Sequence, residues 1–211
     1  YAEGEDERVL RAVQVVVDEK LARPVVIGRP MVVEQRIERL GLRVRPGADF
    51  DLINPDQDDR YREYWSEYLR LTARKGVSEA YAKLEMRRRP TLIGAMMVRL
   101  GAADGMICGT AGPFSEHLRY IDQVIGKQKG SRVYAAMNTL MLPGRQLTLV
   151  DTHVNIDPDA EQLAEITIAA ADELRRFGIL PKVALLSHSH FGSSDHPSAL
   201  KMRETLARLR T

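Results

Sequence analysis

The sequence is poor in cysteine, tryptophan and phenylalanine, with one cysteine, one tryptophan and four phenylalanines among 211 residues. A single cysteine, Cys108, cannot form a disulfide within the chain, so we expect a fold without a disulfide framework and a cytoplasmic location. No apolar run approaches the roughly 20 residues that cross a bilayer, and the acidic start YAEGEDERVL is unlike a signal peptide. We therefore expect no membrane partner.

Motifs and charge exclude further classes of function. No G-x-G-x-x-G follows an expected strand, and there is no P-loop, no H-E-x-x-H and no G-x-S-x-G. A net charge of +2 gives no basic surface for nucleic acid. Because hydrophobic residues make up 44% of the chain, a substantial core is expected. Ligands of open α/β sheets bind in loops at the carboxyl ends of strands, so these loops are where we expect a ligand.

Apolar spacing predicts helices that alternate with short strands. The expected helices cover 5–20, 32–40, 59–75, 78–88, 91–100, 114–125, 160–177 and 198–210. The expected strands cover 24–28, 50–53, 103–109, 131–142, 146–154 and 182–186. Pro143-Gly144-Arg145 predicts a tight turn, which makes the fourth and fifth strands an inserted antiparallel hairpin. The alternation predicts a three-layer α/β fold with a mainly parallel sheet.

The stretch from Leu185 to Arg210, LLSHSHFGSSDHPSALKMRETLARLR, concentrates polar side chains between an apolar run and a helix. Its hydroxyl and amide donors would suit an anion at the start of that helix. The residues expected to line this anion site are Ser187, Ser189, His190, Gly192, Ser193 and Ser194. Two alternatives stay open: a metal bound by His188 and His190, or a capped surface loop without a ligand.

Two further loops offer polar groups at strand ends. Thr110 and Arg119 could meet a phosphate, although an arginine on the following helix could simply be solvated. Asp151 and Asn155 could orient a polar ligand, or they could form a turn beside Pro158, which is the commoner role.

An aromatic stripe marks one side of the expected helix 59–75. Tyr61, Tyr64, Trp65 and Tyr68 share a face at helical spacing. Such residues serve a core or a contact between domains or subunits more often than a ligand platform, and we favour the contact.

The segments ADGMICGT, LVDTHVNIDPDAEQLAEI and RRFGILPKVALLSHSHFGSS resemble the phosphate acetyl/butyryltransferase family over almost the entire chain. The resemblance implies a two-lobed fold like that of isocitrate and isopropylmalate dehydrogenases. We expect residues 1–93 in part of the first lobe and 94–211 in the second, with the hairpin at 131–154 and the ligand-binding loops. Whether the fold is complete at the C-terminus stays open.

A closer resemblance is to the C-terminal domain of large, multidomain bacterial NADP-dependent malic enzymes. The segments that carry it include ARPVVIGRP, DDRYREYW, RPTLIGAMMVR and LLSHSHFGSSDHPSALKMRE. It implies a parent enzyme that oxidatively decarboxylates malate to pyruvate with NADP and Mg or Mn held in another domain of the same polypeptide. This domain would bind acetyl-CoA as an inhibitory effector and form homo-oligomers, a dimer of the domain or a hexamer of the whole enzyme.

The resemblance also bears on catalysis. Active phosphotransacetylases carry their catalytic Ser-Arg pair and an Asp in a later segment, so we expect no catalytic residue, no cofactor and no metal in this chain. Two other hypotheses stay open: an active phosphate acetyltransferase whose remaining segment lies outside the chain, and a purely structural assembly module.

Overall fold

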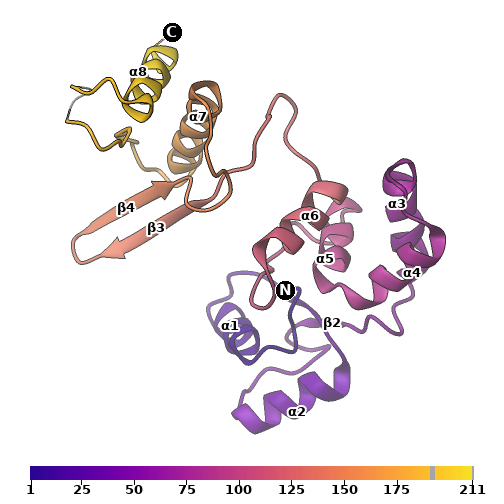
Figure 1. The fold of residues 1–211 in the computed structure, drawn as a ribbon. Helices are drawn as coiled ribbons and strands as arrows, with labels where there is room; N and C mark the ends of the chain where they lie inside the picture. Colours follow the sequence, from indigo (N-terminus) through magenta and orange to yellow (C-terminus); the bar gives the residue numbers. More distant parts are fainter. Residues whose placement is uncertain (191–192, 211) are drawn as a thin grey trace. The chain divides into compact units, whose positions relative to one another are not determined.

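The computed structural model describes residues 1–190 and 193–210. They form two compact units, residues 1–126 and the described part of 127–211 (Figure 1). The lobe boundary expected between residues 93 and 94 stays a prediction.

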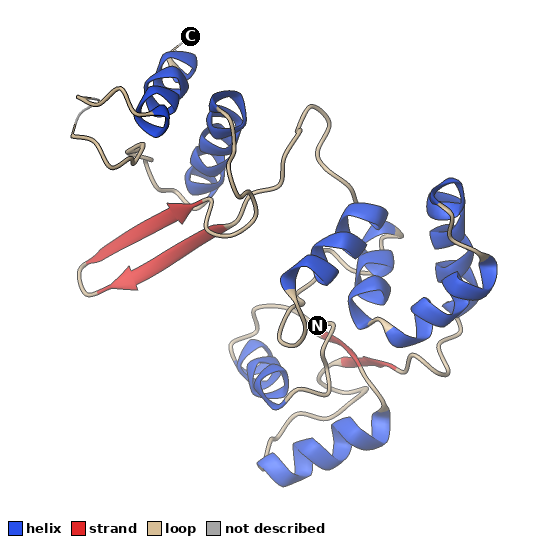
Figure 2. Ribbon diagram, in the orientation of Figure 1, coloured by secondary structure: helices blue, strands red, loops and turns tan. Residues whose placement is uncertain are grey.

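The first unit begins with a small parallel sheet and two helices. Strands β1 (Val25–Ile27) and β2 (Asp51–Ile53) pair in parallel, and helices α1 (Glu7–Asp18) and α2 (Pro30–Leu40) pack with them (Figure 2). Asp6 begins α1 by accepting a hydrogen bond from the Arg8 amide, and Gly41 ends α2 in the left-handed conformation that glycine adopts readily. The core here consists of Val9, Leu10, Val13, Val26, Val33, Ile37, Val44 and Phe50.

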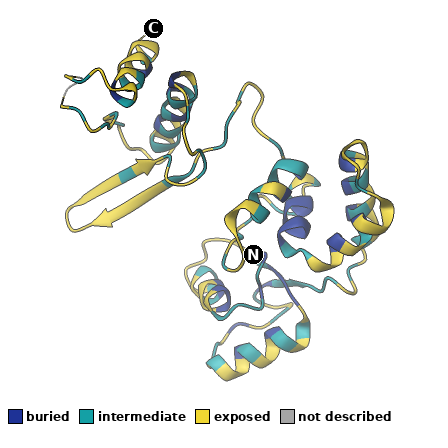
Figure 3. Cartoon of the chain, in the orientation of Figure 1, coloured by how far each residue is buried: buried dark blue, intermediate teal, exposed yellow. Residues whose placement is uncertain are grey.

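The rest of the first unit is helical. It contains α3 (Tyr61–Thr72), the short 3-10 helix η1 (Ala73–Lys75), α4 (Glu79–Arg88), α5 (Pro90–Arg99) and α6 (Phe114–Val124). Ser78 caps α4 by accepting a hydrogen bond from the Tyr81 amide. Helix α5 is almost entirely buried and lies at the centre of this part (Figure 3). An apolar helix surrounded on all sides is what the continuous run TLIGAMMV predicts.

The second unit contains a hairpin and two helices. Strands β3 (Met137–Leu142) and β4 (Arg145–Val150) pair antiparallel around the turn at Pro143-Gly144, and they are followed by α7 (Ala160–Arg176) and α8 (Pro197–Leu209). Asp159 and Gln162 form a reciprocal capping box that begins α7. The hairpin is largely exposed on both faces, with Met141 at 81% exposure (Figure 3).

The α/β class and the expected helices are confirmed, and the sheets are a parallel pair and a hairpin. The expected strands 103–109 and 182–186 are wrong: within the described residues neither pairs as a strand. Their apolar side chains are also partly exposed, with Ile107 at 60% and Leu186 at 75%. An apolar run predicts burial, but a strand also needs a partner backbone, which the run itself cannot supply. No described helix has the length and apolarity to cross a membrane.

Candidate functional site

Arg119 lies on α6, where its guanidinium is held at a buried phenol. Arg119 Nη2 donates to the Tyr120 hydroxyl at 2.8 Å, and its Cζ lies 4.6 Å from the centre of the Tyr120 ring. The Tyr120 hydroxyl in turn donates to Glu85 on α4 through a very short hydrogen bond. Tyr120 and Glu85 are buried, whereas Arg119 is exposed. The guanidinium of the predicted ligand-binding arginine is therefore held in place by Tyr120, while the residue stays exposed to solvent.

Thr110 lies in a loop that the N-terminal segment ties down. Its hydroxyl donates to Glu3 Oε2 at 3.0 Å, and the amide of Gly109 donates to Glu3 Oε1 at 2.9 Å. His117 closes the loop from α6, because its Nε2 donates to the Ala111 carbonyl at 2.8 Å. The Thr110 hydroxyl is thus already engaged, so a ligand at this loop would meet other groups or displace Glu3.

Asp151 and Asn155 meet each other in the second unit. The Asp151 carboxylate accepts from the Asn155 amide at 2.7 Å, from Asn155 Nδ2 at 2.6 Å and from the Ala136 amide at 2.8 Å. Burial raises the pKa of the Asp151 carboxyl, but these hydrogen bonds outweigh it and hold the pKa below its ordinary value. The geometry favours the turn-forming role over an open ligand-binding role.

The serines of the polar loop before α8 bond locally. Ser187 Oγ accepts from the Ser189 amide at 3.2 Å and lies 3.0 Å from Ser189 Oγ. Ser194 Oγ accepts from the His196 amide at 3.1 Å. Both are turns in which a hydroxyl replaces a backbone acceptor. Ser193 is exposed, as is His190, whereas Gly192 lies outside the described residues.

The histidines of the same loop gather at the start of α8. His188 Nδ1 and His196 Nδ1 lie 3.1 and 3.2 Å from the Ser198 hydroxyl, and the two rings meet edge to face at 4.8 Å. His196 caps α8, and Asp195 pairs with Arg203 at 3.0 Å. In the part of the chain that the structure describes, no three His, Cys, Asp or Glu side chains come together as metal ligands.

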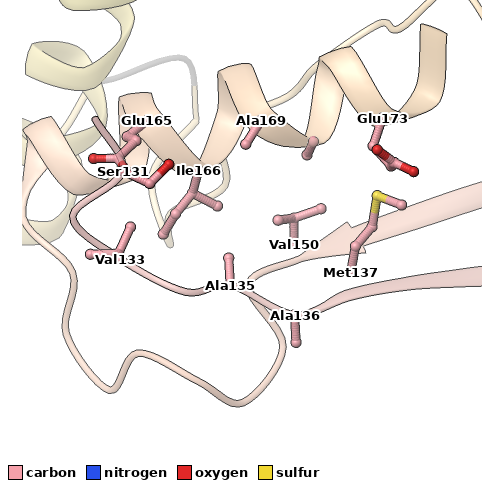
Figure 4. Close-up of a pocket in the computed structure, with 11 residues that line it drawn as sticks. Ser131, Val133, Ala135, Ala136, Met137, Val150, Glu165, Ile166, Ala169 and Glu173 are labelled. Atoms are coloured by element: carbon pink, nitrogen blue, oxygen red, sulfur yellow. The ribbon is translucent and has the colours of Figure 1, made fainter. Parts of the chain in front are cut away.

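Each unit has a cavity among its described residues. The one in the second unit, of about 210 Å³, lies between the segment leading into β3 and helix α7 (Figure 4). Val133, Val150 and Ile166 make it mainly apolar, with Glu165 at its side. The one in the first unit, of about 380 Å³, lies where β1 and β2 end, and the Glu5 carboxylate there already pairs with Arg29 at 2.7 Å.

The aromatic stripe on α3 turns largely into the core of the first unit. Tyr64 and Tyr68 are 2% and 1% exposed. Tyr61 and Trp65 are half-buried against the same core, and Lys83 lies 4.5 Å above the Trp65 ring. Their expected contact with a partner domain or subunit stays a prediction, for which only Tyr61 and Trp65 keep accessible surface.

The structure therefore brings the predicted residues together in pairs, Ser187 with Ser189 and Asp151 with Asn155. Thr110 and Arg119 belong to the first unit and the other predicted ligand-binding residues to the second, so a common cleft stays a prediction. Sequence reasoning missed Glu3, Glu85 and Tyr120. The sequence did hold one signal for Glu85. It lies beside Met86 on α4, at the helical spacing of the residues that face the core.

Three comparisons with known proteins bear on these features. The chain is 50% identical over 208 residues to the NADP-dependent malic enzyme of Escherichia coli, covering 99% of this chain and 27% of that protein. It is 35% identical over 187 residues to the phosphate acetyltransferase of Nitratidesulfovibrio vulgaris, covering 89% of this chain and 26% of that protein. The solved EutD phosphotransacetylase from Staphylococcus aureus matches with a TM-score of 0.86 and 28% identity, over 99% of this chain and 62% of that one.

The chain thus spans about a quarter of the length of these two curated relatives and under two thirds of the solved structure. The Phosphate acetyl/butaryl transferase family model matches residues 1–211, the full length given. The resemblance predicted from the sequence is confirmed, and the chain belongs to the phosphate acetyl/butyryl transferase family.

Proposed function

We propose that this chain is the regulatory, oligomer-forming domain of a cytoplasmic malic enzyme, and that it binds acetyl-CoA as an allosteric inhibitor. The observation that carries the proposal is the similarity to the E. coli malic enzyme, at 50% identity over nearly the whole chain, against 35% to a phosphate acetyltransferase. Since the chain covers 27% of that malic enzyme, most of such a protein is left for the oxidative decarboxylation of malate.

The same proposal assigns the cofactors to another domain. NADP and a divalent metal, Mg or Mn, would bind in the catalytic domain of the same polypeptide. In this chain, the described side chains offer no three-residue metal site, and the sequence has no G-x-G-x-x-G after a strand. This chain's residues would act only on the effector and on the partner subunits.

Chemistry at the candidate loops supports binding rather than turnover. A transferase needs a reacting group activated by a neighbouring base, whereas the hydroxyl of Ser187 is bonded to the amide and hydroxyl of Ser189 within its own loop. Binding needs only donors for phosphate and for the thioester end, such as the exposed guanidinium of Arg119 and the exposed hydroxyl of Ser193.

Inhibition follows if acetyl-CoA binds one arrangement of the oligomer more tightly than another. Allosteric couplings are typically about 1–3 kcal/mol, which corresponds to roughly a 5- to 150-fold difference in affinity. The malic activity would then fall as acetyl-CoA rises, without contact between the effector and the malate site.

Isothermal titration of this 211-residue chain with acetyl-CoA tests the proposal. We expect saturable heat for the wild type, weaker binding for Arg119→Ala and unchanged binding for Arg11→Ala, a matched exposed arginine on α1. In the whole enzyme, acetyl-CoA should lower malate-dependent NADP reduction, and Arg119→Ala should need more acetyl-CoA for the same inhibition. An absence of binding would refute the proposal.

Two further measurements separate the alternatives. Formation of acetyl phosphate from acetyl-CoA and phosphate by the whole protein would establish an active transferase instead. An oligomer whose mass is disrupted by Trp65→Glu, in a wild-type chain that gives no heat with acetyl-CoA, would establish a purely structural module.

A further inference from the structure

The guanidinium of Arg119 is ordered by the hydroxyl of Tyr120, a buried tyrosine that packs in the core of the first unit. Arg119 is exposed, yet its Nη2 lies 2.8 Å from the hydroxyl of Tyr120, which is 2% exposed. Its Cζ also lies 4.6 Å from the Tyr120 ring centre, which adds a cation–π contact. A free surface arginine samples many rotamers, and these two contacts select one of them.

The Tyr120 hydroxyl is itself held in one orientation. It gives its single proton to Glu85, which is 5% exposed, so its lone pairs are left for Arg119. Burial, and then the hydrogen bond to Glu85, raise the pKa of the Tyr120 phenol, so the hydroxyl keeps its proton at neutral pH. Arg89, at the C-terminal end of α4, offsets the negative charge of Glu85, because its Nε lies 3.6 Å from Glu85 Oε2.

A buried carboxylate is costly to keep in a fold, and apolar residues of similar volume often replace buried ion pairs without loss of stability. Here the carboxylate does one further thing: through Tyr120 it fixes a cation at the surface of α6. Arginine has five N–H donors in a rigid fork, and the single bond to Tyr120 leaves an edge of that fork for an outside acceptor. That edge matches two oxygens of a phosphate group.

We infer that Glu85 and Tyr120 are positioning residues that hold the Arg119 guanidinium ready to receive a phosphate group of acetyl-CoA. This inference rests on the proposed function, since it assigns part of the same effector site. Glu85 and Tyr120 act through Arg119 and do not touch the ligand. Their effect is to remove, before binding, the rotamer freedom that Arg119 would otherwise lose on binding.

The test is a set of calorimetric titrations of the 211-residue chain with acetyl-CoA. Arg119→Ala removes a charge-assisted contact and should weaken binding roughly 10- to 100-fold. Tyr120→Phe keeps the ring and the fork but releases the guanidinium, and should weaken binding about 3- to 10-fold. The matched control is Tyr68→Phe: Tyr68 is equally buried, but its hydroxyl donates to Gln123 Oε1 at 2.9 Å, so binding should stay unchanged.

A double-mutant cycle separates positioning from simple loss of structure. If Tyr120 acts through Arg119, Tyr120→Phe has no further effect on affinity in the Arg119→Ala background. Glu85→Gln, which still accepts the phenol proton, should bind acetyl-CoA nearly as the wild type does, whereas Glu85→Leu should behave like Tyr120→Phe. Thermal unfolding of each variant shows that the affinities come from folded protein.

The outcomes distinguish the two proposals. A wild-type chain that gives no heat with acetyl-CoA refutes the proposed function, and this inference falls with it. If the wild type binds, two results overturn this inference alone: Tyr120→Phe binding like Tyr68→Phe, or Tyr120→Phe weakening the Arg119→Ala variant further.

Discussion

Replacing Asp151 by alanine tests whether this carboxylate holds its loop together or waits for a ligand. The carboxylate accepts from the amides of Ala136 and Asn155 and from Asn155 Nδ2, all within 2.8 Å, and more weakly from the Val154 amide at 3.3 Å. One carboxylate thereby joins the segment before β3 to the loop after β4. The structural role predicts a large loss of stability in the absence of any ligand.

The magnitude follows from these bonds. A hydrogen bond to a charged group contributes about 1.5–3 kcal/mol when buried. Asp151 is half-buried, so water replaces part of each bond and about 1 kcal/mol for each of the three short bonds is a fairer value. Asp151→Ala should therefore cost roughly 3 kcal/mol of local stability, which corresponds to a roughly hundredfold larger equilibrium constant for opening of the loop.

Hydrogen exchange measures this directly at the amides of Ala136 and Asn155, which the carboxylate protects. The matched control is Asp157→Ala in the same loop. The Asp157 side chain is 84% exposed and forms an ion pair with Lys201, so its loss should cost well under about 1 kcal/mol. Equal exchange in the Asp151 and Asp157 variants would refute the structural role.

The pH dependence provides a second check on Asp151. Its pKa in the folded protein is held below the ordinary 3.8, so the carboxylate stabilises the fold above that value. This contribution should be lost as the pH falls from 3.8 through the lowered pKa, and the Asp151→Ala variant should lack that part of the acid unfolding curve.

Two further predictions concern the first unit. The Arg70 guanidinium lowers the pKa of Glu67 from 4.5 to about 2. The Glu67 carboxylate should therefore stabilise the fold by about 1 kcal/mol above pH 4.5, and this contribution should be lost as the pH falls toward 2. In urea unfolding at pH 7 and pH 2, Glu67→Gln should differ from the wild type only at pH 7. Gly4→Ala would place a Cβ 2.6 Å from the Ile27 carbonyl oxygen on β1 and should cost about 2 kcal/mol in thermal unfolding, whereas Gly105→Ala meets nothing within 4 Å and should cost little.

Patterns of residues close in sequence predicted most of the helices and the hairpin. Apolar spacing predicted the helices, and Ser78 and Gly41 show why their bounds are local, since capping depends on residues adjacent in sequence. The runs 103–109 and 182–186 failed as strands because pairing depends on backbone that a local pattern does not contain. Within the described chain, 103–109 has instead one backbone bond to the N-terminal segment, from the Ala2 amide to the Ile107 carbonyl at 2.9 Å.

The candidate site was harder to predict than the fold. Polarity and position identified Ser187 and Asp151, but whether a hydroxyl or carboxylate is free for a ligand depends on partners such as Ser189 and Asn155, whose geometry the sequence leaves open. The support beneath Arg119 was missed for a related reason. Glu85 lies 34 residues before it in the chain, and only the packing of α4 against the other helices brings the two within reach of one phenol.

The proposed sensor and an active transferase make different physical demands on these polar groups. A transferase lowers a reaction barrier, which requires a group whose reactivity rises as the transition state forms. A sensor requires only that its ligand bind two arrangements unequally, and a few fixed donors at a rigid surface suffice for that. Under the proposed function, Arg119, held by Tyr120 and Glu85, is a donor of this second kind. A site built from such donors gains affinity through preorganisation, so its failure should appear first in binding, before any chemical step is measured.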